Sequence, residues 1–292
     1  MAFKLTTPVV FMIYNRPHTT GQVFQQIRNS RPAKLLIIAD GHRAGRPADV
    51  TLCAAARATV NNIDWDCEVL RNYSAFNMGC KQRVASGLDW VFNQVEEAII
   101  LEDDCLPHPT FFRYCQELLD RYRTYERIMS ISGSNWQFGQ QRTPYSYYLS
   151  RYFQPWGWAG WRRAWQYYDV NATLWPLLSN CKWLYSPTDS ASEAAYWQRV
   201  FSKVYLKLEE TWDYQNILAG RIQNGVTICP NVNLISNIGY GPGATHTFWE
   251  KGKVTSRLPT QGMDFPLNHP PFIMPDREAD EFVRRLIAAG RV

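Results

Sequence analysis

Three consecutive carboxylates, Glu102-Asp103-Asp104, are the residues whose type and spacing most clearly indicate chemistry. They follow the apolar run 98–101, which predicts a buried strand. Adjacent carboxylates repel one another, so the cluster is costly to bury unless a cation compensates it. Mg²⁺ and Mn²⁺ prefer oxygen ligands and are often shared with substrate phosphates. The alternative is a solvated acidic turn at the start of a helix near Pro109. The position directly after a buried strand favours the metal site.

Polar residues follow two further apolar runs in the same way. Residues 8–14 are followed by Asn15-Arg16, and residues 34–39 by Asp40. Stretches of helical spacing separate the apolar runs, so the predicted class is α/β, with a mostly parallel sheet flanked by helices. Because such sheets bind ligands beyond the carboxyl ends of their strands, we expect these polar residues to line one crevice.

The other expected elements follow from periodicity and turn residues. A Gly-rich loop is expected at 236–246, and a proline-rich tail at 256–276 is expected to wrap the surface. The predicted strands are 8–14, 34–39, 67–70, 98–101, 128–132 and 226–229. One helix is predicted to begin at Pro17. The other predicted helices cover 80–94, 109–125, 192–207 and 211–223.

Composition narrows the class of protein. The chain has 292 residues, is 46% hydrophobic and 20% charged, and can therefore bury a sizeable core. A net charge of +5 spread along the chain does not indicate a nucleic-acid binder, which usually has a clustered basic face. The first apolar run is too short to span a membrane, which leaves only peripheral membrane contact open.

Cysteines and aromatic residues add two expectations. The seven cysteines show no CxxC spacing, so reduced thiols in a cytoplasmic protein are expected rather than a cysteine metal site. Twelve Trp and sixteen Tyr fit either an aromatic core or sugar binding, because apolar sugar faces stack on aromatic rings. Among Trp156, Trp158, Trp161 and Trp165, one or two are expected to line the cleft and the rest to lie in the core.

The acidic cluster resembles the DxD-type motif of GT-A glycosyltransferases. Further segments make the chain similar to the inverting N-acetylglucosaminyltransferase I family, as a bacterial-type relative. These segments are 99–104 (IILEDD), 130–135 (SISGSN), 155–158 (PWGW), 211–213 (TWD) and a Gly-rich loop ending at His246. The resemblance implies one GT-A-like domain over 1–292, divided into a nucleotide-sugar-binding half (8–135), an acceptor and catalytic half (136–250) and a C-terminal wrap (251–292).

The resemblance also implies roles for single residues. Arg16 would approach the donor diphosphate, and Asp40 the uracil or ribose. Glu102 would contact the donor sugar or ribose. Asp104 would ligate Mn²⁺ or Mg²⁺, with His246 near the metal or the diphosphate.

Three more residues complete the expected donor site. Asp103 is placed there as part of the acidic cluster. Residues 77–81 (NMGCK) precede a predicted helix and are either a plain turn or a loop whose amides, together with Lys81 and Arg83, help to hold the nucleotide.

Asp213 would be the catalytic base by the same resemblance. Neighbouring Glu209 and Glu210 are expected to raise its pKa toward a useful range. Without the resemblance, Asp213 reads as the cap of the helix it begins. The related enzymes often carry a second acid after the Trp-Asp pair, where this chain has Tyr214.

Together these features predict a metal-dependent, inverting hexosyltransferase of polysaccharide biosynthesis. Its donor would be a UDP-sugar such as UDP-GlcNAc, and its acceptor a hydroxyl of a glycan or glycolipid. A sugar-nucleotide nucleotidyltransferase is one alternative, although residues 14–17 (YNRP) are not the Gly-rich phosphate loop that usually follows its first strand. A catalytically inactive sugar-binding protein of the same fold is the other.

Overall fold

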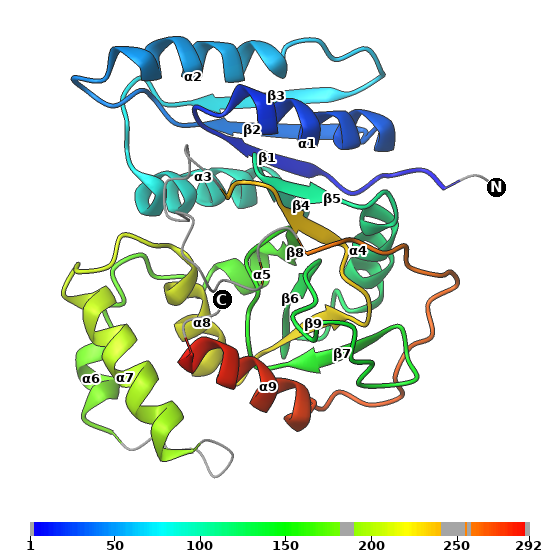
Figure 1. Cartoon of the computed structure of the whole chain (residues 1–292), viewed down its shortest axis with the longest axis vertical. Helices are drawn as coiled ribbons and strands as arrows, with labels where there is room; N and C mark the ends of the chain where they lie inside the picture. The colour runs from blue at the N-terminus through cyan, green and yellow to red at the C-terminus, as the bar shows by residue number, and fades with distance from the viewer. Residues whose placement is uncertain (1–2, 182–189, 241–254, 256–257, 290–292) are drawn as a thin grey trace.

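The computed structural model describes residues 3–181, 190–240, 255 and 258–289. One eight-stranded sheet, in the order β3-β2-β1-β4-β8-β6-β9-β7, runs through the molecule (Figure 1). Strands β3, β2, β1 and β4 are parallel, β8 is antiparallel to both of its neighbours, β6 and β9 are parallel, and β7 is antiparallel to β9. The predicted α/β class with a mostly parallel sheet flanked by helices is therefore confirmed.

The bounds of the elements are as follows. The strands of the large sheet are β1 Val9–Ile13, β2 Lys34–Ala39, β3 Glu68–Tyr73, β4 Glu97–Glu102, β6 Ile128–Ser132, β7 Tyr147–Ser150, β8 Trp158–Trp161 and β9 Val226–Pro230. A two-stranded sheet pairs β5 Cys105–Pro107 with β10 Ile235–Asn237. The helices are α1 Pro17–Ser30, α2 Pro47–Thr59, α3 Cys80–Gln94, α4 Thr110–Arg121, α5 Arg162–Trp165, α6 Trp175–Ser179, α7 Ala191–Tyr205, α8 Asp213–Ile222 and α9 Arg277–Ala288.

Alternating residues of the central strands face two apolar cores, because successive strand side chains point to opposite faces. Phe11 of β1 packs in one core with Phe24 of α1 and Phe111 of α4. Val10 packs in the other core with Leu88 of α3. Both faces of β1 and β2 are covered, which explains why their sequences are continuous apolar runs.

The register of the parallel strands brings three carboxyl ends to one level. Ile13 of β1 pairs with Ala39 of β2, and Met12 pairs with Glu102 of β4. The chain moves outward from β1 through β2 to β3 on one side, while β4 lies on the other side of β1. A crevice is expected at such a reversal of strand order.

The C-terminal segment closes the other end of the sheet. Its described part passes from residue 258 along the loops beside β9 and β7 and ends in α9, which lies against β7 (Figure 1). Asp280 of α9 is buried and accepts hydrogen bonds from Ser150 Oγ at 2.6 Å and from the Arg151 backbone N–H at 3.2 Å. A buried carboxylate therefore anchors the helix to the edge strand.

Folding stability is expected to depend on pH through Asp280. Burial raises the pKa of this carboxyl from 3.8 to about 6, although Ser150 and Arg151 oppose the shift. The folded protein thus binds this proton more tightly than the unfolded chain, so the stabilisation is lost as pH rises from about 4 through about 6. Denaturant unfolding at pH 4.5 and 7.5 should show that Asp280→Asn gains about 2 kcal/mol relative to the wild type between these two values, because at pH 4.5 the carboxyl of the unfolded chain is already mostly ionised. An equal difference at both pH values would contradict it.

Candidate functional site

A cavity of about 280 Å³ lies at the carboxyl ends of β1, β2 and β4. The starts of α3 and α8 complete its wall. The predicted site residues that line it are Arg16, Asp40, Arg83, Glu102, Asp103, Asp104 and Asp213. The strand ends and the 211–213 segment, far apart in the chain, therefore meet in one place.

Arg16 binds both aspartates of the acidic cluster. Its Nη2 lies 2.7 Å from Asp103 Oδ1 and its Nη1 lies 2.7 Å from Asp104 Oδ2. Asp103 also accepts the backbone N–H of Tyr14 at 3.0 Å. Burial disfavours the charged guanidinium, but Asp104 and Asp103 outweigh it and raise the pKa of Arg16. The side chain that was predicted to meet the diphosphate therefore rests on the carboxylates.

The cluster carries more negative charge than Arg16 neutralises. Burial first, and then the Asp104 carboxylate, raise the pKa of Glu102. Burial likewise raises the pKa of Asp103, and Arg16 only partly opposes this. Burial and mutual repulsion thus make the charged carboxylates of the cluster costly, and Arg16 offsets only part of this cost.

Asp40 lines the cavity but is fully engaged by backbone. Its carboxylate accepts the N–H groups of Gly41, Met78 and Gly79 at 2.9–3.1 Å, and Asn77 Nδ2 at 2.9 Å. It thus holds the 77–79 loop at the start of α3. Its contact with a nucleoside stays a prediction.

Lys81 and Arg83, both on α3, differ in their positions. Arg83 lines the cavity, yet its Nε donates to Ala39 O at 3.2 Å and its Nη2 to Asn72 O at 2.6 Å, so it ties α3 to the strand ends. Lys81 is buried and, in the described part of the chain, is not among the residues that line the cavity. Direct donor contact by Lys81 stays a prediction without support from this geometry.

Asp213 is the first residue of α8 and faces the cavity. The hydroxyl of Thr211 donates a hydrogen bond to its Oδ1. Trp212, not Asp213, occupies the N-cap position of the helix. The capping interpretation of Asp213 is therefore weakened, and its carboxylate, which a neighbouring hydroxyl holds at the cavity wall, stays a candidate general base.

His246 lies outside the described residues. The Gly-rich loop that precedes it is described as far as Tyr240 and crosses the acidic cluster. The backbone N–H of Ile238 donates to Asp104 O at 2.8 Å, and Asn237 lines the cavity. At Gly239 a Cβ would overlap Asp104 Oδ2 and lie 2.8 Å from Arg16 Nη1. Only glycine allows this close approach.

Gly239→Ala should therefore damage the site with little effect on the core. The added methyl group must push Asp104 or Arg16 aside, so we expect UDP affinity to fall by about tenfold or more, since misplacing site groups by about 1 Å can cost a hundredfold. Titration with UDP in the presence of Mn²⁺ measures this. Gly220→Ala is the matched control, because a Cβ at Gly220 meets no atom within 4 Å; equal affinities of both variants would contradict the expectation.

The residues of the cavity fit a metal ion only if the substrate supplies some of the ligands. Within the described residues there is no group of three or more His, Cys, Asp or Glu side chains that could hold a metal ion. Mg²⁺ commonly takes one or two protein carboxylates and completes its shell with water and substrate phosphates. The Nε of Arg16 is buried and lacks a hydrogen-bond partner within the described structure, so an anionic acceptor is expected beside it. Asp104 together with a diphosphate fits Mn²⁺ or Mg²⁺, whereas Asp104 by itself does not.

Arg43 lines the cavity and was not predicted, whereas Cys80 belongs to the 77–81 segment that was expected to help hold the nucleotide. Cys80 begins α3, and its thiol lines the cavity, but burial and the carboxylates of Glu102 and Asp213 raise its pKa, which makes it a poor nucleophile. Its place after Gly79, at the start of a predicted helix, was the available signal. Trp156 is the one of the four candidate tryptophans that lines the cavity, while the other three are buried in the core, as expected.

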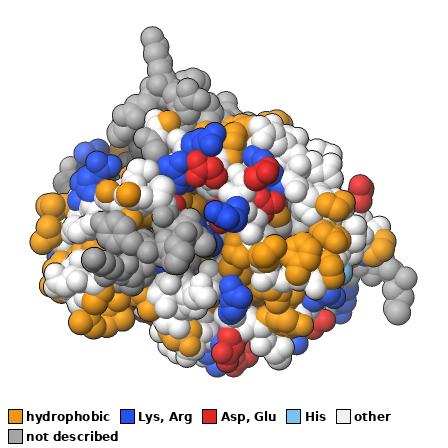
Figure 2. All heavy atoms as spheres, turned by 90° about the horizontal axis from the view of Figure 1, so that it is seen from below, with side chains coloured by type: hydrophobic (Ala, Val, Ile, Leu, Met, Phe, Trp, Pro, Cys, Tyr) orange, Lys and Arg blue, Asp and Glu red, His pale blue; other side chains and the backbone are white. Residues whose placement is uncertain are grey.

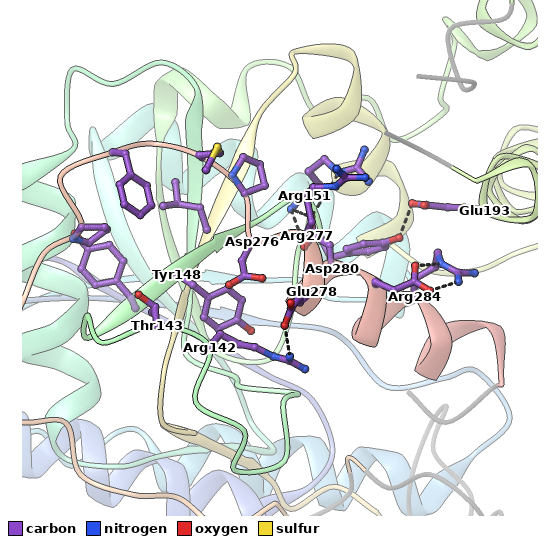
Figure 3. Close-up of a pocket in the computed structure, with 18 of the residues that line it drawn as sticks. Arg142, Thr143, Tyr148, Arg151, Glu193, Asp276, Arg277, Glu278, Asp280 and Arg284 are labelled. Atoms are coloured by element: carbon purple, nitrogen blue, oxygen red, sulfur yellow. Dashed lines mark hydrogen bonds and ion pairs between the residues drawn. The ribbon is translucent and has the colours of Figure 1, made fainter. Parts of the chain in front are cut away.

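A larger groove of about 1170 Å³ lies elsewhere, between β7, the segment before α9, and α9 itself (Figure 3). Its lining includes none of the predicted site residues. Its charged side chains pair with one another, as in Arg142–Glu278 at 3.6 Å and Arg151–Asp280 at 3.5 Å. Figure 2, which views the molecule from below Figure 1, shows basic and acidic side chains close together on that face. The smaller cavity is the better candidate, because it joins three consecutive carboxylates with an arginine whose Nε lacks a partner within the described residues.

No described helix is both long and apolar enough to cross a membrane.

Comparison with known proteins gives only distant likenesses. No protein-family model matches the chain, and no curated protein matches it in sequence. Among solved structures it is similar to UDP-glucose pyrophosphorylase complexed with UDP-glucose (9% identity, 77% of this chain and 90% of that chain, TM-score 0.35). It is also similar to a cytidylyltransferase from Leptospira borgpetersenii serovar Hardjo-bovis (11% identity, 69% and 74%, TM-score 0.31) and to mouse xyloside xylosyltransferase 1 in its apo form (11% identity, 74% and 81%, TM-score 0.36). At these scores the likenesses do not decide the function, which has to be inferred from the cavity itself.

Proposed function

We propose that this protein is a metal-dependent, inverting glycosyltransferase that moves a sugar from a nucleotide-diphosphate donor to a hydroxyl of a glycan or glycolipid. The observation that supports it most is the meeting of Arg16 and the carboxylates 102–104 with Asp213 in one cavity at the carboxyl ends of β1, β2 and β4. A cation-binding cluster and a separate carboxylate base are the two parts that such a transfer needs.

The cluster side of the cavity suits the leaving group. When bound, Mn²⁺ or Mg²⁺ would neutralise the negative charge that grows on the diphosphate as its bond to the sugar breaks. Asp104 would hold the ion, with His246 as a second candidate ligand. Arg16 would offer its guanidinium to a phosphate oxygen, and its Nε has no hydrogen-bond partner within the described residues.

The opposite wall suits the acceptor. Asp213 would take the proton from the attacking hydroxyl, and Thr211 would hold its carboxylate in place. A base on the side of the sugar away from the diphosphate leads to inversion by direct displacement. Trp156 lines the cavity with an aromatic ring, which suits the apolar face of a sugar.

A panel of nucleotide sugars that includes UDP-GlcNAc, incubated with the protein and Mn²⁺, tests this function. We expect slow release of the nucleoside diphosphate from one donor, dependent on Mn²⁺ and faster with a suitable glycan or glycolipid acceptor. Release of pyrophosphate from a nucleoside triphosphate and a sugar phosphate would instead identify a nucleotidyltransferase. Binding of a donor without any turnover across an acceptor panel would favour an inactive sugar-binding protein.

A further inference from the structure

We propose that Arg16 is a resident counter-cation that occupies the metal-binding carboxylates until a diphosphate draws it away. Metal and nucleotide diphosphate would then bind as a coupled pair, and neither would bind tightly alone. This inference rests on the proposed function, because it concerns the same carboxylates.

The guanidinium bridges both aspartates rather than forming a single contact. Its two terminal nitrogens each lie 2.7 Å from a carboxylate oxygen, one on Asp103 and one on Asp104. Arg16 is the N-cap residue of α1 and precedes Pro17, so its backbone is fixed at the end of β1. A planar fork held by two carboxylates is a strong, geometrically defined ion pair.

Asp104 offers no easy second approach to a cation. Its Oδ2 is bound by Arg16, and its Oδ1 accepts the Cys105 thiol at 3.6 Å. The Cα of Gly239 packs so closely on Oδ2 that there is no space for even a methyl group. A metal ion that binds Oδ2 would therefore take the place that Arg16 Nη1 now holds.

Charge makes that exchange unfavourable without an anion. A divalent cation beside a retained Arg16 would meet a like charge at short range, where protein groups screen poorly. A diphosphate removes this repulsion, because it can accept Arg16 while it also ligates the metal. The Nε of Arg16 is buried and lacks a partner within the described residues, so it would become a donor to the diphosphate once the guanidinium moves.

Asp103 would keep one hydrogen-bond partner if Arg16 moved away. The backbone N–H of Tyr14 still donates to its Oδ2 at 3.0 Å. The two aspartates therefore differ. Asp103 keeps its backbone hydrogen bond, whereas the side-chain partner of Asp104 would change from Arg16 to the metal.

Coupled binding has a measurable signature. Linkage requires that the diphosphate raise metal affinity by the same factor by which the metal raises diphosphate affinity, and such factors are typically about 5- to 150-fold. Equilibrium dialysis of Mn²⁺, with and without UDP and corrected by a protein-free Mn²⁺–UDP titration, gives this factor. For the wild-type protein we expect weak Mn²⁺ binding alone and at least about tenfold tighter binding with UDP.

Arg16→Gln decides whether Arg16 is the cause. If it is, Mn²⁺ alone should bind the variant about tenfold more tightly than the wild type, and the UDP effect should shrink toward unity. Unchanged or weaker binding of Mn²⁺ alone would overturn the inference. If the variant does not fold, Arg16→Lys replaces it; it keeps a cation but loses the fork, so metal affinity should lie between wild type and the expected Gln value, and a value below wild type would overturn the inference.

Two controls separate this inference from the proposed function. Arg28→Gln removes another arginine of α1 that pairs with a carboxylate, Asp64, at the surface, and it should leave Mn²⁺ binding unchanged. Asp104→Asn should abolish Mn²⁺ binding with and without UDP. If Mn²⁺ binding survives Asp104→Asn, the proposed metal site is wrong; if it is lost there but Arg16→Gln has no effect, only the role of Arg16 is wrong.

Discussion

Replacing Asp104 by Asn is expected to reduce Mn²⁺-dependent donor binding and turnover by at least about a hundredfold, while the melting temperature changes little. A catalytic metal supplies several kcal/mol of charge stabilisation, and each 1.4 kcal/mol is a factor of ten. The carboxamide retains the size of the side chain against Gly239 and an oxygen for Arg16 Nη1, which lies 2.7 Å from Asp104 in the wild type. Donor binding by titration, initial rates and thermal unfolding measure the three quantities.

The control for Asp104→Asn is another aspartate that pairs with an arginine but lies outside the cavity. Asp64→Asn removes the half-exposed partner of Arg28 and should leave donor binding and turnover unchanged. Full donor binding by the wild-type protein in excess chelator would show that Asp104 does not act through a metal.

Replacing Asp213 by Asn should lower turnover by about a hundredfold to ten-thousandfold, the usual effect of losing a general base. Donor affinity should change little, because the base faces the acceptor and the diphosphate lies with the strand-end carboxylates. The substitution retains the shape of the side chain and an acceptor for the Thr211 hydroxyl. The N-cap of α8 is Trp212, so the helix does not lose its cap, and the melting temperature should hold.

Asp120→Asn is the matched control for Asp213→Asn. It makes the same change at an exposed carboxylate of α4 that does not line the cavity, so its turnover should stay near that of the wild type. Near-normal turnover of Asp213→Asn, or a product that retains the anomeric configuration of the donor, would exclude Asp213 as the base of an inverting transfer.

Much of the fold could be read from local pattern. The predicted runs at 34–39 and 128–132 have the bounds of β2 and β6, and the predicted helix at 80–94 has those of α3. Central strands are covered on both faces and therefore appear as continuous apolar runs. Helix α3 is buried along one face and exposed on the other, which gives its sequence a helical period.

The missed elements show the limit of such patterns. β7 and β8 have four residues each and lie in or near an aromatic-rich stretch, so neither shows a usable period. Both are antiparallel strands whose place depends on partners from elsewhere in the chain. The helix α9 was also missed, although Asp276, which accepts the Ala279 N–H at its N-terminus, is a start signal that the sequence displays.

The sequence by itself determined that carboxylates follow a buried strand and that polar residues lie at the ends of neighbouring strands. It could do so because a buried strand is a run of apolar residues, and the polar residues after it mark its end. The tertiary structure alone decided what each charge binds. Arg16 pairs with Asp104, which lies 88 positions later in the sequence. Asp40 also follows a strand end, but its carboxylate accepts backbone N–H groups of the 77–79 loop instead. Pairings of this kind depend on strand order and register, and a buried charge takes whichever partner the fold places within hydrogen-bond distance.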